Sequence, residues 1–310
     1  MAAALVLIAA GFAIGFRMAQ PPPPPDFEAL RQAAEGDGDA AAAPAVPTSS
    51  APPSPGASDR GVDPPRTEPP PSAPGMEPLV VARQPAPGRS GAPRIALVID
   101  DLGRSLADIE ALGRLGVPIT YAVLPFETRT PEVVSMLRGR GQEIFVHLPM
   151  EAKGAANPGP GALRVAMADA ELRRLTAAAL DAVPGAVGVN NHMGSAVAAD
   201  RRSMSTVLQE LKQRGLVFLD SRTSADSLGY SLARQFDVPA GERQVFLDTH
   251  RDRDFIRKQF RVLRKSSTKR GAAIAIAHPY RETLEILAEE VPAAKADGFE
   301  FLVASRLFDR

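Results

Sequence analysis

Ile95-Ala-Leu-Val-Ile-Asp-Asp-Leu-Gly103 is the stretch that decides the fold. Its five leading apolar residues are typical of a strand that is buried on both faces of a parallel sheet. The apolar run ends abruptly in two carboxylates, Asp100 and Asp101. Side chains alternate along an extended strand, so we expect these two carboxylates to point to opposite faces. One of them would bind a cation, while the other acts as a base or orients a neighbour.

Similar apolar runs recur downstream and alternate with helical patterns. We predict strands at 95–99, 119–124, 143–146, 186–189, 216–219, 244–247, 273–277 and 299–303. Helices are predicted at 107–115, from Pro131 onward, and at 170–182, 201–214, 226–235, 254–268 and 281–291. Parallel neighbours need crossover connections, so this order favours a parallel sheet covered by helices on both faces. The α/β pattern predicts a distorted (β/α) barrel of seven or eight strands, with an open doubly wound sheet as the alternative.

Composition divides the chain into three parts. Residues 1–20 begin with an apolar run from Ala2 to Phe16, which is short for a membrane span and suits an export signal. We expect an uncleaved signal-anchor there, with a cleaved signal as the alternative. Residues 21–93 hold 20 of the 30 prolines and lack apolar periodicity, which predicts a disordered linker. Residues 94–310 are then the single folded domain that carries the chemistry.

Charge and cysteine content exclude several classes of function. The chain has 36 basic and 36 acidic residues, so nothing indicates a nucleic-acid partner. The absence of cysteine excludes thiolate metal ligands, disulfides and cysteine nucleophiles.

We expect a domain anchored in the inner membrane and facing the periplasm, or secreted to the periplasm, with membrane contact through the N-terminal segment only.

Polar side chains gather at or just beyond the predicted strand ends, and all four histidines of the chain are among them. Both candidate architectures have their active site at the carboxyl ends of the strands. Carboxylate and imidazole groups without cysteine suit a divalent metal, with Zn²⁺ as the first expectation. The polar groups in question are Asp100, Asp101, His147, Asn190, Asn191, His192, Asp220, Arg222, Asp248, His250, His278 and Tyr280.

Each of these groups also has a purely structural interpretation. The two aspartates would cap the following helix, and His147 would be a hydrogen-bonded core histidine. His278 would simply end a strand, and we expect His250 to lie on the surface of a charged loop. Taken together, however, the convergence at strand ends is harder to explain structurally.

Five motifs fall at these strand ends in a fixed order. They are Ile95-Ala-Leu-Val-Ile-Asp-Asp-Leu-Gly103, Val146-His-Leu-Pro-Met-Glu151, Gly188-Val-Asn-Asn-His-Met-Gly-Ser195, Phe218-Leu-Asp-Ser-Arg-Thr223 and Ile276-Ala-His-Pro-Tyr280. Together they resemble the divergent polysaccharide deacetylases, the YibQ-like group, over about residues 94 to 305. The resemblance implies the NodB-like distorted barrel of the carbohydrate esterase and deacetylase superfamily, and removal of acetyl groups from N-acetylated sugars.

The resemblance also implies roles for individual residues. Matched by position, Asp100 resembles the catalytic base and Asp101 the metal carboxylate. His147 resembles the first metal-ligating histidine and His278 the general acid, while Arg222 would orient the base.

One position departs from the pattern of the better-known members. They carry a second histidine four residues after the first, and here that place is Glu151. His192, on the next strand, looks like the substitute ligand, and Glu151 would coordinate as well or hydrogen-bond a ligand. We expect Asn191, Asp220 and Tyr280 to contact substrate.

Three functions compete on the sequence alone. The leading hypothesis is a metal-dependent envelope hydrolase that removes N-acetyl groups from a polysaccharide or peptidoglycan sugar. The alternative is a non-catalytic glycan-binding or scaffold protein that keeps the deacetylase fold. A serine esterase is disfavoured, because no Gly-x-Ser-x-Gly elbow surrounds Ser195.

Overall fold

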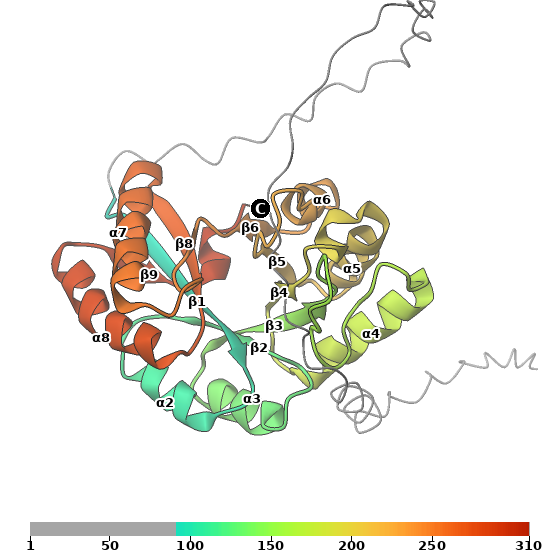
Figure 1. Ribbon diagram of the computed structural model, residues 1–310, viewed down its shortest axis with the longest axis horizontal. Coiled ribbons are helices and arrows are strands. Elements are labelled where there is room, and N and C mark those ends of the chain that lie inside the picture. The colour runs from blue at the N-terminus through green and yellow to red at the C-terminus, as the bar shows by residue number, and fades with distance from the viewer. Residues whose placement is uncertain (1–90, 310) are drawn as a thin grey trace, which may run out of the picture.

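The computed structural model describes residues 91–309, which are built around one curled parallel sheet. Eight strands follow the order β6-β5-β4-β3-β2-β1-β8-β7, and β9 also pairs with β1. Helices α2 to α8 lie around the outside of the sheet (Figure 1). The strands are β1 (Arg94–Leu102), β2 (Thr120–Val123), β3 (Glu143–Met150), β4 (Gly188–Met193), β5 (Val217–Asp220), β6 (Ala240–Glu242), β7 (Val245–Phe246), β8 (Ala272–Ala277) and β9 (Glu300–Leu302).

The helices are α2 (Leu106–Gly113), α3 (Thr130–Gly139), α4 (Asp169–Ala182), α5 (Arg201–Gln213), α6 (Gly229–Gln235), α7 (Arg253–Arg270) and α8 (Arg281–Ala296), with short 3-10 turns η1 (Val197–Ala199) and η2 (Ala304–Leu307). Local chemistry sets several of their starts. Ser105, Asp200 and Asp252 each accept a hydrogen bond from a backbone N–H in the first turn of the helix that follows. These caps explain why the starts of α2, α5 and α7 agree with the predicted starts to within one residue.

The predicted distorted (β/α) barrel is confirmed. Every pairing between two of the strands β1 to β9 is parallel, and an isolated antiparallel bridge joins Ala240 to Asp309. The two ends of the sheet path, β6 and β7, are not hydrogen-bonded to each other in this part of the chain, so the barrel does not close completely. Arg243 lies at that seam, and its guanidinium donates to the carbonyls of Ser221 and Arg222 at 2.7 and 2.9 Å.

Four strand predictions differ from the structure by more than two residues. Strand β6 was not predicted, because Ala240-Gly-Glu242 is too short and too weakly apolar to be recognised without its partner β5. Strands β1, β3 and β4 run further than predicted, to Leu102, Met150 and Met193. Their polar residues therefore lie within paired strands rather than beyond them.

Two faces of the sheet bury two separate apolar layers. Alternate residues such as Ile95, Leu97 and Ile99 belong to the large cluster that includes the helices. The intervening residues Ala96 and Val98 belong to the smaller cluster that fills the barrel. The other fully or partly buried members of this inner cluster are Ala122, Phe145, Val217, Leu219, Phe246, Ile274, Ile276, Ala304, Leu307 and Phe308.

The C-terminal segment fills the barrel end opposite the predicted site. Ala304 and Phe308 belong to the inner cluster. The Ala304 N–H donates to the Thr120 hydroxyl at 2.8 Å, and the Ser305 hydroxyl donates to the Glu143 carboxylate. These contacts join η2 to the first residues of β2 and β3, so the open end of the barrel is the end where the strands finish.

The predictions for the N-terminal segment (1–20) and for nearly all of the linker (21–93) lie outside the described residues. Between residues 91 and 309, no helix combines the length and the apolar character needed to cross a membrane.

Gly188, at the start of β4, tests how tightly the barrel is packed. An added Cβ would lie 2.6 Å from Val217 Cγ2 and 2.8 Å from Phe145 Cε1. We expect Gly188→Ala to lower the free energy of unfolding in urea by about 1–3 kcal/mol, because both neighbours must move. Gly139→Ala is the control, since its Cβ would meet nothing within 4 Å and alanine favours a helix. Equal stability of the two variants would contradict the tight packing described here.

Candidate metal centre

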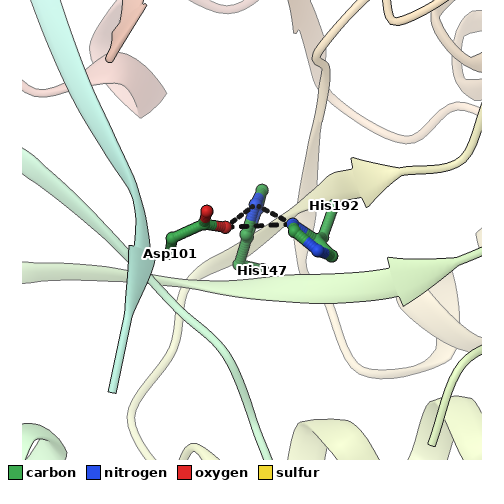
Figure 2. A group of neighbouring side chains, drawn as sticks. All are labelled: Asp101, His147 and His192. Carbon is green, nitrogen blue, oxygen red and sulfur yellow. Dashed lines mark hydrogen bonds and ion pairs between the residues drawn. The ribbon is translucent and has the colours of Figure 1, made fainter. Parts of the chain in front are cut away.

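Three side chains from strands β1, β3 and β4 converge on one point at the open end of the barrel. Asp101 lies on β1, His147 on β3 and His192 on β4, and Figure 2 shows their polar atoms facing one another. Asp101 Oδ1 lies 3.0 Å from His192 Nδ1 and 3.3 Å from His147 Nε2. The two imidazole nitrogens are 3.1 Å apart.

These three atoms fit the donor set of a divalent cation. Bonds of about 2.0–2.1 Å in a tetrahedral zinc site separate two ligands by roughly 3.3–3.4 Å. Asp101 Oδ1 is buried and has no hydrogen-bond partner among residues 91–309, although both imidazole nitrogens lie close to it. A buried oxygen without a donor is costly, and a cation would remove that cost. One carboxylate and two imidazoles also leave positions free for water and substrate.

A left-handed residue brings both aspartates to the same site. Asp101 has a φ of 58°, and the pairing of β1 with β2 shifts register between Ile99 and Leu102. As a result, Asp100 Oδ2 and Asp101 Oδ1 lie 3.6 and 3.3 Å from the same atom, His147 Nε2. The expectation that the two carboxylates face opposite sides is therefore wrong. Alternation holds for an extended strand, and aspartate is one of the few residues that tolerate the left-handed region.

Electrostatics separate the two carboxylates. Burial works to raise the pKa of the Asp101 carboxyl, but His147 and His192 outweigh burial and lower this pKa well below its usual range. Asp100 is 3% exposed, and burial raises its pKa although the charges of His147 and His278 oppose the rise. A carboxyl with a lowered pKa, such as Asp101, suits a metal ligand, and a carboxyl with a raised pKa, such as Asp100, suits a proton acceptor.

Asp248 orients His278, which is a role that the sequence analysis did not assign. The Asp248 carboxylate accepts from the His278 backbone N–H at 2.7 Å and lies 3.0 Å from His278 Nδ1. It also accepts from the Thr283 hydroxyl at 2.8 Å. With Nδ1 facing the carboxylate, His278 Nε2 faces the centre, 3.7 Å from Asp101 Oδ2. The signal for this pair was present in the sequence, because Asp248 also follows a predicted strand.

Three of the remaining predicted residues have structural partners. Arg222 Nε lies 3.8 Å from Glu242, and no contact described within residues 91–309 joins Arg222 to Asp100. The side chain of Asn191 is hydrogen-bonded to Met193, Ser221 and Thr223, and the residue is 1% exposed. Asp220 is fully buried, and its carboxylate accepts from the backbone N–H groups of Arg222 and Tyr230 and from the Ser227 hydroxyl. We therefore remove Asn191 and Asp220 from the groups that contact substrate, because their polar atoms are buried and already bonded.

Three further residues singled out from the sequence lie around the centre or away from it: Tyr280, Glu151 and His250. Tyr280 is half-buried and stacks on His278 with ring centroids 5.0 Å apart, so it adjoins the centre. Glu151 accepts from the Val165 backbone N–H at 2.7 Å and lies outside the converging group of ligand atoms. His250 is exposed, as expected, and its ring meets the edge of Phe255.

Residues 97–308 match the family model described as divergent polysaccharide deacetylase. The chain belongs to the divergent polysaccharide deacetylase family. This confirms the resemblance that the five strand-end motifs indicated.

Relatives of this deacetylase-family chain agree with the assignment. An uncharacterized protein of Haemophilus influenzae is 32% identical over 63% of this chain and 69% of its own length. The uncharacterized protein YibQ of Escherichia coli K12 is 33% identical over 64% of this chain and 62% of its own length. The crystal structure of an uncharacterized protein of Agrobacterium tumefaciens C58 superposes with a TM-score of 0.66, at 25% identity, over 72% of this chain and 92% of that chain.

The pair formed by Asp248 and His278 predicts a pH-dependent stability. Burial lowers the pKa of His278, but Asp248, assisted by the charges of Asp100 and Asp101, outweighs burial and raises it. Folded His278 therefore holds its proton more tightly than unfolded His278. The resulting stabilisation is fully present below the ordinary histidine pKa of about 6.5, and it is lost as the pH rises through the higher folded pKa.

We expect His278→Gln to lower the free energy of unfolding of the metal-free protein more at about pH 5.5 than at about pH 9. Urea titrations in the presence of a chelator measure this difference. His250→Gln is the control, because His250 is exposed and is not part of the pair formed by Asp248 and His278. A larger loss for His278→Gln at the higher pH would contradict the pairing with Asp248.

Proposed function

We propose that this protein is a metal-dependent hydrolase of the cell envelope that removes N-acetyl groups from a polysaccharide or peptidoglycan sugar. The observation that carries the proposal is the convergence of Asp101, His147 and His192 on one point, with Asp100 and His278 beside them. Membership of the divergent polysaccharide deacetylase family supports a carbohydrate deacetylase-like role.

Asp101, His147 and His192 would hold the cation, and their oxygen and nitrogen donors favour Zn²⁺ among the divalent metals. When bound, such an ion supplies a Lewis acid that lowers the pKa of a water molecule and polarises a carbonyl. Glu151 is not among the proposed ligands, because its carboxylate is bonded to the Val165 N–H.

Asp100 and His278 provide the two proton transfers that amide hydrolysis requires. The oxygen of water bonds to the acetyl carbon while Asp100 takes a proton from that water. The bond between the acetyl carbon and nitrogen then breaks, and the nitrogen takes the proton held on His278 Nε2. Acetate and a free amine are the products. Asp248 keeps Nε2 directed at the centre by bonding to Nδ1.

Tyr280 is the proposed contact to the sugar, because it is half-buried and stacks on the same imidazole. Its guanidinium neighbour Arg251 lies 3.6 Å from the ring centroid and is exposed. Substrate would therefore approach the centre along this side of the barrel mouth.

Localisation at the inner membrane, facing the periplasm, or secretion to the periplasm forms part of the same proposal. It rests on the apolar run from Ala2 to Phe16 and on the proline-rich stretch that follows. Polymeric envelope glycans are substrates that a domain on a long tether would reach.

The full chain, assayed with chitooligosaccharides and peptidoglycan fragments, should release acetate with added Zn²⁺ and none with a chelator. Asp100→Asn should lower kcat by about 10²–10⁴-fold, the usual effect of losing a general base, and leave the zinc content unchanged. His250→Gln should match wild type. Absence of acetate from wild-type protein that binds zinc normally would refute the deacetylase proposal for these substrates.

Glu151 stands where the better-known deacetylases carry their second histidine. This difference favours a second candidate, a glycan-binding or scaffold protein that has kept the fold but catalyses no reaction. If the protein has this second function, the Asp100→Asn and His278→Ala variants should rescue cells that lack the gene as fully as the wild-type protein does. Failure of both variants to rescue these cells, with normal protein levels, would eliminate this candidate.

A further inference from the structure

We propose that Asn190 is a positioning residue that fixes the proton of His147 and the carboxylate of Asp100 at the same time. The inference rests on the proposed metal site, because its purpose is to keep one ligand and the base ready for use. Asn190 is fully buried on β4, which is paired on both sides, with β3 and β5.

The amide of Asn190 bridges the two groups directly. Its Nδ2 donates to Asp100 Oδ1 at 2.8 Å and lies 3.3 Å from the Ser221 hydroxyl. Its Oδ1 lies 2.9 Å from His147 Nδ1. The two residues it joins are 90 and 43 positions away in the sequence, so only the folded barrel brings the three together.

The direction of each hydrogen bond follows from the chemistry of the partners. In the ionised form in which Asp100 acts as a base, its carboxylate only accepts, so the NH₂ group of Asn190 faces Asp100. The amide oxygen then faces His147 Nδ1, and because this oxygen only accepts, Nδ1 must carry a proton. A flipped amide would set an oxygen, which has no proton to donate, against the Asp100 carboxylate.

This order decides which nitrogen of His147 can bind a cation. A neutral imidazole with its proton on Nδ1 has its free electron pair on Nε2. That nitrogen is the atom that lies 3.3 Å from Asp101 Oδ1 and 3.1 Å from His192 Nδ1. Asn190 thus keeps the ligand atom unprotonated in neutral His147 and holds Asp100 beside the same ring.

Asn191 is a matched control on the same strand. It is 1% exposed, so the two asparagines are equally buried. Its amide, however, bonds to Met193, Ser221 and Thr223 and to none of the converging ligands. A merely structural effect of losing a buried amide should therefore appear equally in Asn190→Ala and Asn191→Ala.

The first test measures zinc affinity by competition with a chelator. We expect Asn190→Ala to bind zinc about 10–100-fold more weakly than wild type, as is typical when the partner of a ligating histidine is removed. Asn191→Ala should bind zinc as wild type does. Equal zinc affinity in Asn190→Ala and Asn191→Ala would overturn the proposal.

Asn190→Asp separates the two arms of the bridge. A carboxyl oxygen still accepts from His147 Nδ1, but its other oxygen faces the Asp100 carboxylate, so the two groups share a proton and Asp100 is no longer a free base. We expect this variant to keep wild-type zinc affinity and to lose kcat at saturating zinc. Wild-type kcat would overturn the arm to Asp100, and zinc affinity as weak as that of Asn190→Ala would overturn the arm to His147.

The position of the proton on His147 can also be measured directly in the wild-type chain. Nitrogen-15 NMR of the four histidines, assigned by single substitutions, reports which ring nitrogen of His147 is protonated. We expect neutral His147 in the metal-free protein to carry its proton on Nδ1, the nitrogen that faces Asn190 Oδ1. A neutral His147 with its proton on Nε2 would overturn the proposal. Neither zinc affinity nor this spectrum depends on deacetylation, so a failure of the proposed reaction remains distinguishable.

Discussion

The site depends on one electrostatic constraint, which is the crowding of carboxylates and imidazoles into a space that water barely reaches. Asp100 and His147 are 3% and 2% exposed, and Asp101 Oδ1 is buried without a hydrogen bond. Such groups are expensive to bury unless opposite charges or a cation compensate them. The fold supplies this compensation, because the carboxylates of Asp100 and Asp101 lie within 4 Å of imidazole nitrogens. These imidazoles belong to His147, His192 and His278.

The barrel makes this crowding possible through the alternation of its strands. Ala96, Val98 and Asp100 lie on the inner face of β1, and Ile274, Ile276 and His278 follow the same pattern on and after β8. Apolar side chains fill the barrel, and polar side chains follow them at the inward positions near the ends of β1 and β4 and just after β8. The C-terminal turn fills the opposite end, so the polar end is the one left open to a substrate.

Alternation also explains which sequence predictions needed correction. Asn190 and His192 have the inward parity of β4, whereas Asn191 between them is turned toward the helices. Asp220 likewise follows the inward Leu219 and lies on the outer side, where it bonds to the backbone at the start of α6. Because Asn191 and Asp220 point to the outer side of the sheet, their polar atoms form structural hydrogen bonds and do not face the site. Asp101 is the exception, because its left-handed backbone overrides the alternation.

The sequence by itself determined the parallel α/β barrel, the positions of most helices and strands, and the family. Apolar runs, capping residues and strand-end motifs are local signals, so one sequence suffices to detect them. Only the tertiary structure decided that both aspartates reach His147, that Asp248 orients His278, and that Asn190 rather than Arg222 holds Asp100. These relationships join residues dozens of positions apart and depend on strand register and one left-handed φ, which local patterns do not specify.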